Sequence, residues 1–496
     1  MSLIKKLAGE TVIYGVSSIL PRVLHYIVFT IYLTRKFPEQ SDFGIYKDLY
    51  AYATIILVLL VYRMDTAFFR FGSREDGVVR TFTTGMIPIF ITSLIIISLM
   101  WFNAQNIADI LQYPDQAYYV KWFALILGFD ALTAMPFAKY RLENRPMRFL
   151  VVKLLNVFIT IALVLFFLEI CPLLLENGVS LVDGIYNPDK KLDYIFISNL
   201  IASFVVFLFV LPELFKEKLD FDLALWKKML KYSLPLVIVG IAGNINTAFA
   251  APLQKYFLGG DLSENLKNVG IYAAPASLAI FLNLFNVAFN YAAEPFFFKN
   301  YKESNRENLF GKVALLYTIF GAFVLLGILM YLDSFMKIMG ANYRSATEIV
   351  PILLFANLFL GLYYNFSIWY KLKDKTHVGA IISIVGAIIT LVISIVLLPK
   401  IGYLASAWAA FACFAFMATA GYVTGRIYYP IDYPIKKILI YTFIAFLLFK
   451  VSVFVSSFGL SAVMFFAVNT LLLLCYGIFT FMLDKETLRE MFASNQ

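Results

Sequence analysis

The first apolar segment of the chain, "YGVSSILPRVLHYIVFT" at 14–30, carries charged and polar side chains in a stretch that is otherwise fit to cross a bilayer. Steps of four, four and three place four of them on one helical face: Tyr14, Ser18, Arg22 and His25. An arginine at the centre of a membrane helix costs at least about 2.5–3.5 kcal/mol. Its planar guanidinium, however, stays charged and binds phosphate oxygens with two hydrogen bonds. With a bend expected at Pro21, we predict that this face lines a wet cavity in which Arg22 meets an anion.

An ion pair with an acidic residue of a neighbouring span is the alternative role for Arg22. The acidic residues in the apolar segments are Asp65, Asp130 and Glu294. The same three carboxylates are our candidates for coupling transport to an ion, with H⁺ or Na⁺ as the candidate ions. His25 has two interpretations, because its ordinary pKa of about 6.5 suits a proton carrier and a neutral imidazole suits plain hydrogen bonding.

A polar stripe runs along the apolar segment near 270–292. Asn283, Asn286, Asn290 and Glu294 follow at steps of three, four and four, so they share one helical face. Hydrogen bonds between helices, worth about 1 kcal/mol each, would explain single asparagines; four in register favour a cavity wall. The other predicted cavity-lining residues are Asn244, Asn246, Asn357, Tyr364 and Asn365.

Enzymatic chemistry finds no support in the sequence. There is no HExxH, GxSxG or Walker A motif, and the three cysteines are far apart without metal-binding spacing. The net charge of +9 does not indicate nucleic-acid binding, because the basic residues fall in the loops between apolar runs. We therefore predict a protein that is not an enzyme and needs no cofactor or metal.

The elements that must position these side chains are membrane-spanning helices. Of the 496 residues 61% are hydrophobic and 15% charged, and the apolar residues form runs of about 20. The sequence predicts fourteen spans, near 11–33, 45–68, 81–102, 117–138, 149–170, 194–212, 232–253, 270–292, 310–331, 347–369, 377–398, 403–425, 436–456 and 461–482. With the N-terminus inside, the cytoplasmic segments hold 27 of the 41 Lys and Arg residues and the outside segments 12, which favours an N-in/C-in orientation.

Three sequence echoes predict an internal repeat. Gly-Ile-Tyr opens both the second and the eighth span, at Gly44 and Gly270; "YRLENR" at 140–145 matches "YKLKDK" at 370–375; and Pro21 matches Pro235. The offsets are similar and each half has six spans, so the halves should lie parallel and rock against each other around a substrate. The predicted fold is all-α, with an N-lobe at 1–220, a C-lobe at 221–430 and a C-terminal helix pair at 431–496.

Several segments resemble the O-antigen-type polysaccharide flippases (Wzx-like oligosaccharide flippases) of the multidrug/oligosaccharidyl-lipid/polysaccharide exporter (MOP) superfamily. They are "YGVSSILPRVL", "DFGIY", "MDTAFFRFGSRE" and "YRLENRP" in the first half, and "SLPL", "VGIYAAP", "AEPFFFK", "YNFSIWYKLKDKT" and "LLPKIGYLASAWA" in the second. They cover most of residues 10–430 in the expected order.

The resemblance implies a transporter in the bacterial inner membrane that flips a polyprenyl-pyrophosphate-linked oligosaccharide outward. It implies a cationic cavity for the pyrophosphate, and Arg22 matches a basic position of the family's first-helix motif. We add Arg63 and Lys255 to this set by inference, although Arg63 could equally reach the cytoplasmic interface. The expected partners are this lipid and membrane lipids, and the expected state is a monomer. The alternatives are a cation-coupled multidrug or metabolite antiporter of the same superfamily and, more remotely, a membrane glycosyltransferase or polymerase.

Overall fold

The computed structural model describes residues 20–485 apart from 22, 73–76, 144, 180–181, 183, 217–219, 301–305 and 374. It gives the backbone alone at 291–292, 294–296, 298–300 and 306–307. Every regular element in this part of the chain is helical, which confirms the all-α prediction for the residues described.

Thirteen helices in the described residues are long and apolar enough to cross a membrane. They are Gln40–Gly72, Val78–Phe102, Pro114–Leu142, Pro146–Glu176, Pro188–Phe215, Leu223–Ala248, Leu262–Asn290, Asn308–Met330, Ile349–Leu372, Thr376–Ile401, Leu404–Tyr428, Ile435–Ser456 and Ala462–Leu483. They correspond one to one with the second to fourteenth predicted spans. Much of the first predicted span lies outside the described residues, so the total of fourteen and the N-in/C-in orientation stay predictions.

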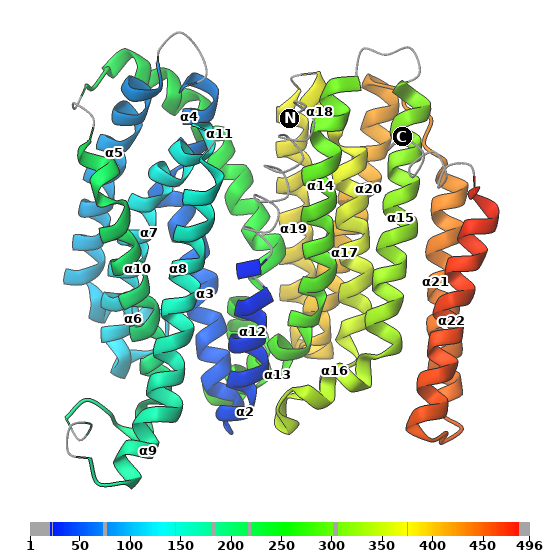
Figure 1. Cartoon of the computed structure of the whole chain (residues 1–496), viewed down its shortest axis with the longest axis horizontal. Helices are drawn as coiled ribbons and strands as arrows, with labels where there is room; N and C mark the ends of the chain where they lie inside the picture. Colours follow the sequence, from blue (N-terminus) through cyan, green and yellow to red (C-terminus); the bar gives the residue numbers. More distant parts are fainter. Residues whose placement is uncertain are drawn as a thin grey trace. The chain divides into compact units, whose positions relative to one another are not determined.

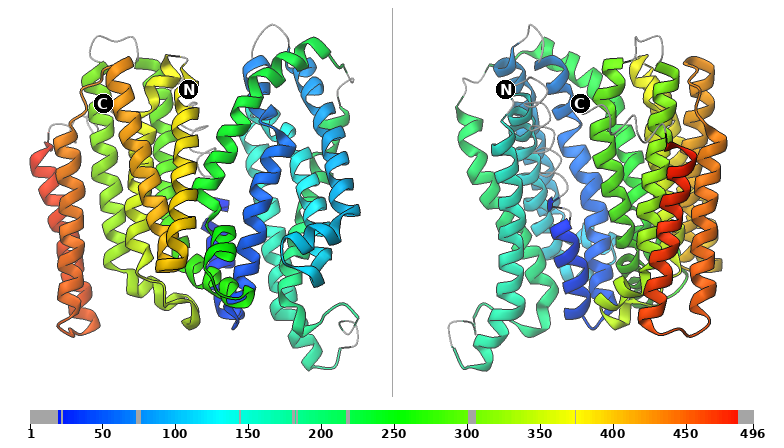
Figure 2. Two further views of the ribbon diagram at one scale, coloured as in Figure 1. Left: turned by 180° about the vertical axis from the view of Figure 1, so that it is seen from behind. Right: turned by 45° about the vertical axis from the view of Figure 1, so that its right-hand side comes forward.

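The chain divides into two compact units (Figures 1 and 2). The N-terminal unit comprises Met1–Asn244 and Gly260–Leu266, and the C-terminal unit comprises Ile245–Gly259 and Lys267–Gln496. Within each unit the long helices run roughly alongside one another. The predicted lobe limits at 220 and 430 stay predictions.

The elements of the N-terminal unit are η1 (Ile27–Tyr32), α2 (Leu33–Lys36), α3 (Gln40–Val61), α4 (Met64–Gly72), α5 (Val78–Phe102), α6 (Ala104–Ile110), η2 (Pro114–Gln116), α7 (Ala117–Leu142), α8 (Pro146–Leu165), η3 (Phe166–Ile170), α9 (Cys171–Glu176), η4 (Pro188–Lys190) and α10 (Lys191–Phe215). Two helices begin in this unit and end in the other, α11 (Leu223–Ala248) and α13 (Leu262–Ala276). The C-terminal unit adds α12 (Ala250–Phe257), η5 (Ser277–Ala279), α14 (Ile280–Asn300), α15 (Arg306–Met330), α16 (Leu332–Ile338), η6 (Ala341–Tyr343), α17 (Ile349–Phe366), α18 (Ile368–Leu372), α19 (Thr376–Ile401), α20 (Leu404–Tyr428), α21 (Ile435–Ser456) and α22 (Ala462–Leu483).

Two spans of the N-terminal unit change from α-helix to π-helix, and the two π segments are joined. The segments are η1, which leads into α2, and η3, which continues α8. The hydroxyl of Tyr32, at the end of η1, donates to the Glu169 carboxylate in η3 at 2.7 Å, and Lys36 Nζ lies 2.8 Å from the same carboxylate. A π turn closes its hydrogen bonds one residue later than an α turn, so each segment accommodates an extra residue.

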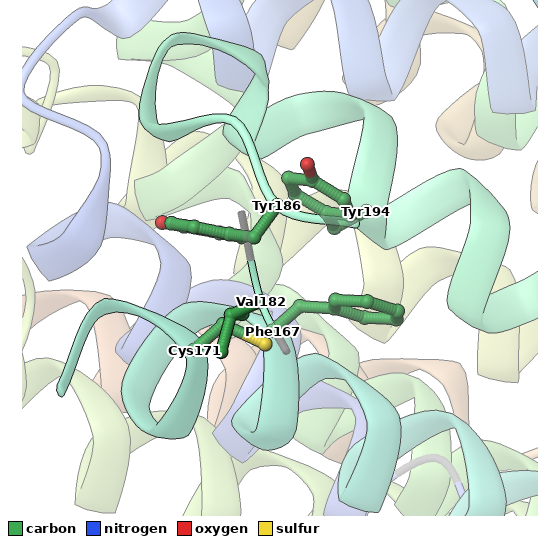
Figure 3. Packing of buried hydrophobic residues seen from close by; sticks show 5 residues of the cluster. All are labelled: Phe167, Cys171, Val182, Tyr186 and Tyr194. Atoms are coloured by element: carbon green, nitrogen blue, oxygen red, sulfur yellow. The ribbon is translucent and has the colours of Figure 1, made fainter. Parts of the chain in front are cut away.

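The loop between α9 and α10 packs onto the ends of the helices that it connects (Figure 3). Phe167, Cys171, Val182, Tyr186 and Tyr194 form a buried cluster there. The ring centroids of Phe167 and Tyr194 lie 4.7 Å apart, and those of Tyr186 and Tyr194 lie 5.1 Å apart. The Tyr194 hydroxyl accepts a hydrogen bond from the backbone N–H of residue 187 and donates one to the carbonyl of residue 185. The tyrosine thus fixes the loop backbone to α10.

Charged side chains join the ends of α7, α8 and α10 around one buried carboxylate. Glu213, which is 7% exposed, lies 2.8 Å from Arg148 Nη1, 3.6 Å from Arg145 Nη1 and 3.9 Å from Lys139 Nζ. Lys139 is 1% exposed and also lies 3.9 Å from Glu143. We call these five residues the Glu213 cluster. It ties together three spans at the side predicted to be cytoplasmic.

Candidate functional site

The helix that crosses the membrane at 40–72 is broken at Tyr62 and Arg63. Their φ angles are 33° and 56°, so two consecutive non-glycine residues adopt the left-handed conformation between α3 and α4. Such conformations cost of order 1–3 kcal/mol each and gather at functional sites. The sequence predicted one continuous helix over this span, and the break is a correction to that prediction. Neither glycine nor proline occurs at the break, so no sequence signal marked it.

The guanidinium of Arg63 lies against the bare backbone of α11. A Cβ atom at Gly240 would come within 2.8 Å of Nη2 and 2.9 Å of Nε of Arg63. The arginine is partly buried, and no carboxylate is in ion-pair contact with it among the residues that the structure describes. An arginine in an apolar span, without an acidic partner among the described residues, remains able to bind an anion.

The break adds polar backbone to this place. The Arg63 carbonyl accepts the backbone N–H groups of residues 66 and 67 at 3.1 and 3.2 Å, so the first turn of α4 starts there. The N–H groups of residues 64 and 65 then belong to the unpaired start of a nine-residue helix. Half-helix starts inside membranes attract anionic groups. Asp65 in the same turn offsets part of this positive potential, and like Arg63 it makes no ion pair with the described residues.

Helix α11 is fixed on both sides of Gly240, by a hydrogen bond to α3 beyond it and by an ion pair to α5 before it. Asn244, one turn further along the same face, donates its side-chain amide to the Thr54 carbonyl at 3.0 Å. At the start of α11, the Asp222 carboxylate accepts the N–H groups of Leu225 and Ala224 and lies 2.8 Å from Arg80. The hydrogen bond from Leu225, then the bond from Ala224 and the Arg80 charge, hold the pKa of Asp222 below its ordinary value, although desolvation acts in the opposite direction. Asn244 therefore serves as a positioning residue for the Arg63–Gly240 contact.

The asparagine stripe on α14 divides into bonded and unbonded members. Asn286 is 1% exposed, donates to the Asn357 carbonyl at 2.8 Å and accepts from the Tyr317 hydroxyl at 2.8 Å. This geometry favours interhelical hydrogen bonding for Asn286, the alternative that the sequence left open. Asn283 and Asn290 are partly buried, and their side chains bond to no residue that is described.

The other predicted cavity residues of the C-terminal unit also have contacts inside that unit. Asn246 donates to the carbonyl of residue 383 at 3.4 Å and accepts from Thr390 at 3.3 Å. The side-chain amide of Asn357 donates to its own helix, at the carbonyl of residue 353. Buried Asn365 donates to the carbonyl of residue 361, and its own carbonyl accepts from the Tyr433 hydroxyl at 3.1 Å. Tyr364 is partly buried beside Tyr363, with 6.0 Å between ring centroids.

Lys255, one of the predicted pyrophosphate ligands, is buried. It lies on α12 with 2% exposure, and its Nζ is 5.1 Å from the ring centroid of Tyr256. Its neighbour Gln254 is fully buried and donates to the Ser406 hydroxyl at 3.0 Å. The ammonium group therefore lies among the packed helices of the C-terminal unit.

The remaining predicted residues are described only in part. His25 Nε2 lies 3.2 Å from the Tyr46 hydroxyl, and its ring stacks on Phe29 at 4.3 Å, so hydrogen bonding is established and proton transfer stays a prediction. Asp130 is partly buried and makes no ion pair within the described ranges. Tyr14, Ser18, Arg22 and the side chain of Glu294 lie outside what the structure describes.

No protein-family model matches the chain, and no curated protein matches it by sequence. Solved structures do match along most of its length. The lipid II flippase MurJ, in an inward-closed conformation, has a TM-score of 0.73 at 13% identity, over 95% of this chain and 99% of the flippase. An inward-facing multidrug resistance transporter of the MATE family, from the MOP superfamily, has a TM-score of 0.64 at 13% identity, over 82% of this chain and 94% of the transporter.

The chain has the fold of MOP-superfamily transporters. A further MATE structure in a bent conformation agrees, with a TM-score of 0.56 at 14% identity over 86% of this chain and 94% of that one. This MOP-type fold confirms the fold expected from the sequence resemblance. At these identities it is the fold alone that is shared.

Proposed function

We propose that this protein flips a polyprenyl-pyrophosphate-linked oligosaccharide across the bacterial inner membrane by alternating access. The observation that carries the proposal is Arg63, an arginine inside a membrane span, without an acidic partner among the described residues, beside a broken helix. A diphosphate offers the bidentate acceptor that a guanidinium fits. The likeness of the fold to a lipid II flippase along nearly the whole chain supports a lipid-linked substrate.

In the proposed mechanism the pyrophosphate binds near Arg63 and Arg22, and the sugars lie along Asn283 and Asn290. Asp65 and Asp130, which make no ion pair with the described residues, are the proposed sites for a coupling proton or sodium ion. Lys255 remains a secondary proposal for binding the pyrophosphate, and Glu294 remains a secondary proposal for binding the coupling ion. The protein is proposed to act as a monomer.

Mass spectrometry of the lipid that co-purifies with the full-length protein tests this proposal. The expected result is a polyprenyl-pyrophosphate species from wild-type protein, much reduced in Arg63→Ala. Cells lacking the gene should accumulate the same species in the inner leaflet. If those cells export glycan normally and instead become sensitive to cationic drugs, the antiporter alternative replaces the flippase.

The contact between Arg63 and Gly240 gives a prediction with a control on the same helix. In Gly240→Ala the new methyl group displaces the guanidinium, and we expect glycan export to fall about tenfold, since a displacement of about 1 Å at a functional group costs up to about 10²-fold. In Gly243→Ala the new Cβ would meet no atom of the described residues within 4 Å, and export should stay at the wild-type level. Complementation of deleted cells at matched protein levels measures both. Equal export by the two variants would remove Gly240 from the site.

A further inference from the structure

The repeated loop motif has two copies, and the charged side chains of the two copies have different partners. "YRLENR" lies between α7 and α8, and "YKLKDK" lies between α17 and α19. Arg145 of the first copy and two cations just outside it, at 139 and 148, surround the buried carboxylate of Glu213, which α10 supplies. The second copy therefore raises the question of which residue occupies the place of Glu213.

That place is occupied by an arginine. Helices α10 and α20 are both 25 residues long, and each packs against the two helices that flank its copy of the loop. Glu213 lies two residues before the end of α10, and Arg426 lies two residues before the end of α20. The two helices end in "VLPELF" and "VTGRIY", so the buried acid of the first copy corresponds to a base in the second.

The cations of the second copy rest on aromatic rings instead. Lys375 Nζ lies 3.9 Å from the ring centroid of Tyr428, and that ring also stacks on Trp369 at 5.3 Å and 16°. Lys373 Nζ lies 5.2 Å from the ring centroid of Tyr429. Lysine over a tyrosine keeps its full positive charge, because the ring attracts the cation without neutralising it.

No described carboxylate pairs with this set. Lys373, Lys375 and Arg426 have no ion pair with any residue that the structure places, and Asp374, the one acid of the loop motif, lies outside the described residues. We call Lys373, Lys375, Arg426 and Tyr428 the basic patch. Helices α18 and α20 contact each other at one end of the C-terminal unit (Figure 1), and Lys375 on the Tyr428 ring links the loop motif to the last turn of α20, which carries Arg426.

The surroundings of the patch suit the surface of a membrane. Ile427 is 70% exposed and Tyr428 is 48% exposed in the same turn that carries Arg426. An exposed aliphatic side chain, a tyrosine and three cations on the side predicted to be cytoplasmic are what the boundary between acyl chains and anionic headgroups accommodates.

We propose that the basic patch binds the phosphate of an anionic phospholipid in the cytoplasmic leaflet. Charge complementarity selects the headgroup, and Ile427 contacts the beginning of the acyl chain. Glu213 provides the neutralising charge in the first half of the chain, and the lipid phosphate provides it in the second. This site is separate from the proposed transport site, and the proposal does not depend on the identity of the transported substrate.

Native mass spectrometry of the full-length protein in neutral detergent tests the site, with phosphatidylglycerol as the probe and phosphatidylcholine as the uncharged comparison. Arg426→Glu gives position 426 the negative charge that Glu213 has in the first half of the chain. We expect this variant to bind phosphatidylglycerol about tenfold or more weakly. Lys337→Glu makes the same change of charge on α16, at an exposed position, and should bind as wild type does. The double variant Lys373→Ala/Lys375→Ala should weaken binding without introducing an acid.

Each outcome decides the proposal. The proposal is supported if phosphatidylglycerol binding is lost in Arg426→Glu and in the double lysine variant and is retained in Lys337→Glu. The proposal is overturned if the protein binds the two phospholipids equally. It is also overturned if Lys337→Glu loses as much phosphatidylglycerol binding as Arg426→Glu, or if Arg426→Glu binds phosphatidylglycerol as wild type does. Displacement of the lipid by inorganic pyrophosphate at equal concentration also overturns it, because the patch would then bind dissolved phosphate.

Discussion

Replacing Arg63 with alanine is expected to reduce glycan export about 10²-fold and to leave the protein at least as stable as wild type. Hydrogen bonds to a charged group contribute about 1.5–3 kcal/mol each, and a diphosphate held by two of them loses at least about 3 kcal/mol when both disappear. Stability should not fall, because the arginine makes no ion pair with the described residues and its charge is costly within an apolar span. Export by deleted cells expressing the variant, and thermal unfolding of the purified protein, measure the two effects.

The matched control for this variant is Arg70→Ala. Arg70 lies on α4, the helix that follows the break, and its guanidinium is 4.3 Å from the ring centroid of Tyr232. It is exposed, so its loss removes the same charge without touching the break. Export near the wild-type level is expected. Equal loss of export in both variants would mean that the net charge at this end of the 40–72 span matters. That result would contradict the proposed anion site at Arg63.

Removing the central carboxylate of the Glu213 cluster should have the largest effect on stability. In Glu213→Ala three cations lose their common partner, and one of them is buried Lys139, whose Nζ lies 3.9 Å from that carboxylate. Breaking a buried ion pair from one side costs about 3–5 kcal/mol. A marked drop in the thermal unfolding midpoint of detergent-solubilised protein is the expected measurement.

Glu169→Ala is the comparison for Glu213→Ala. Its partner Lys36 and its own side chain are 38% and 44% exposed, so their ion pair is expected to contribute about 0–1 kcal/mol. The unfolding midpoint should therefore change little. A midpoint for Glu213→Ala no lower than that for Glu169→Ala would contradict the role given to the cluster.

The thirteen spans could be predicted because the length of an apolar run is a local property of the sequence. Each run must satisfy its backbone hydrogen bonds internally when it enters the bilayer, and this condition selects helices of about 20 residues. The repeat stays a prediction, which rests on turn residues and loop charges that recur at similar offsets. The break at Tyr62 and Arg63 could not, since residues with ordinary helical preferences are held there by their packing against α11.

For a similar reason the sequence could select candidate side chains for the site but not their contacts. A regular spacing shows which side chains share a helical face, but it does not show what covers that face. Asn286 therefore looked like its neighbours Asn283 and Asn290, although only Asn286 meets Tyr317 and the Asn357 backbone. Lys255 looked accessible at the end of an apolar run, whereas α12 buries it. Arg63 was among the candidates from the sequence, and Gly240, which gives its side chain room, was not.

The joined π segments bear on how this chain should be aligned with other sequences. An extra residue in a helix rotates everything beyond it by about 100°, so a single such insertion would turn one span away from its partner. Here Tyr32 and Glu169 connect two such segments. A relative that lacks one extra residue would have to lack the other to preserve the contact. Alignments of distant homologues should therefore show paired one-residue gaps, one near 27–32 and one near 166–170.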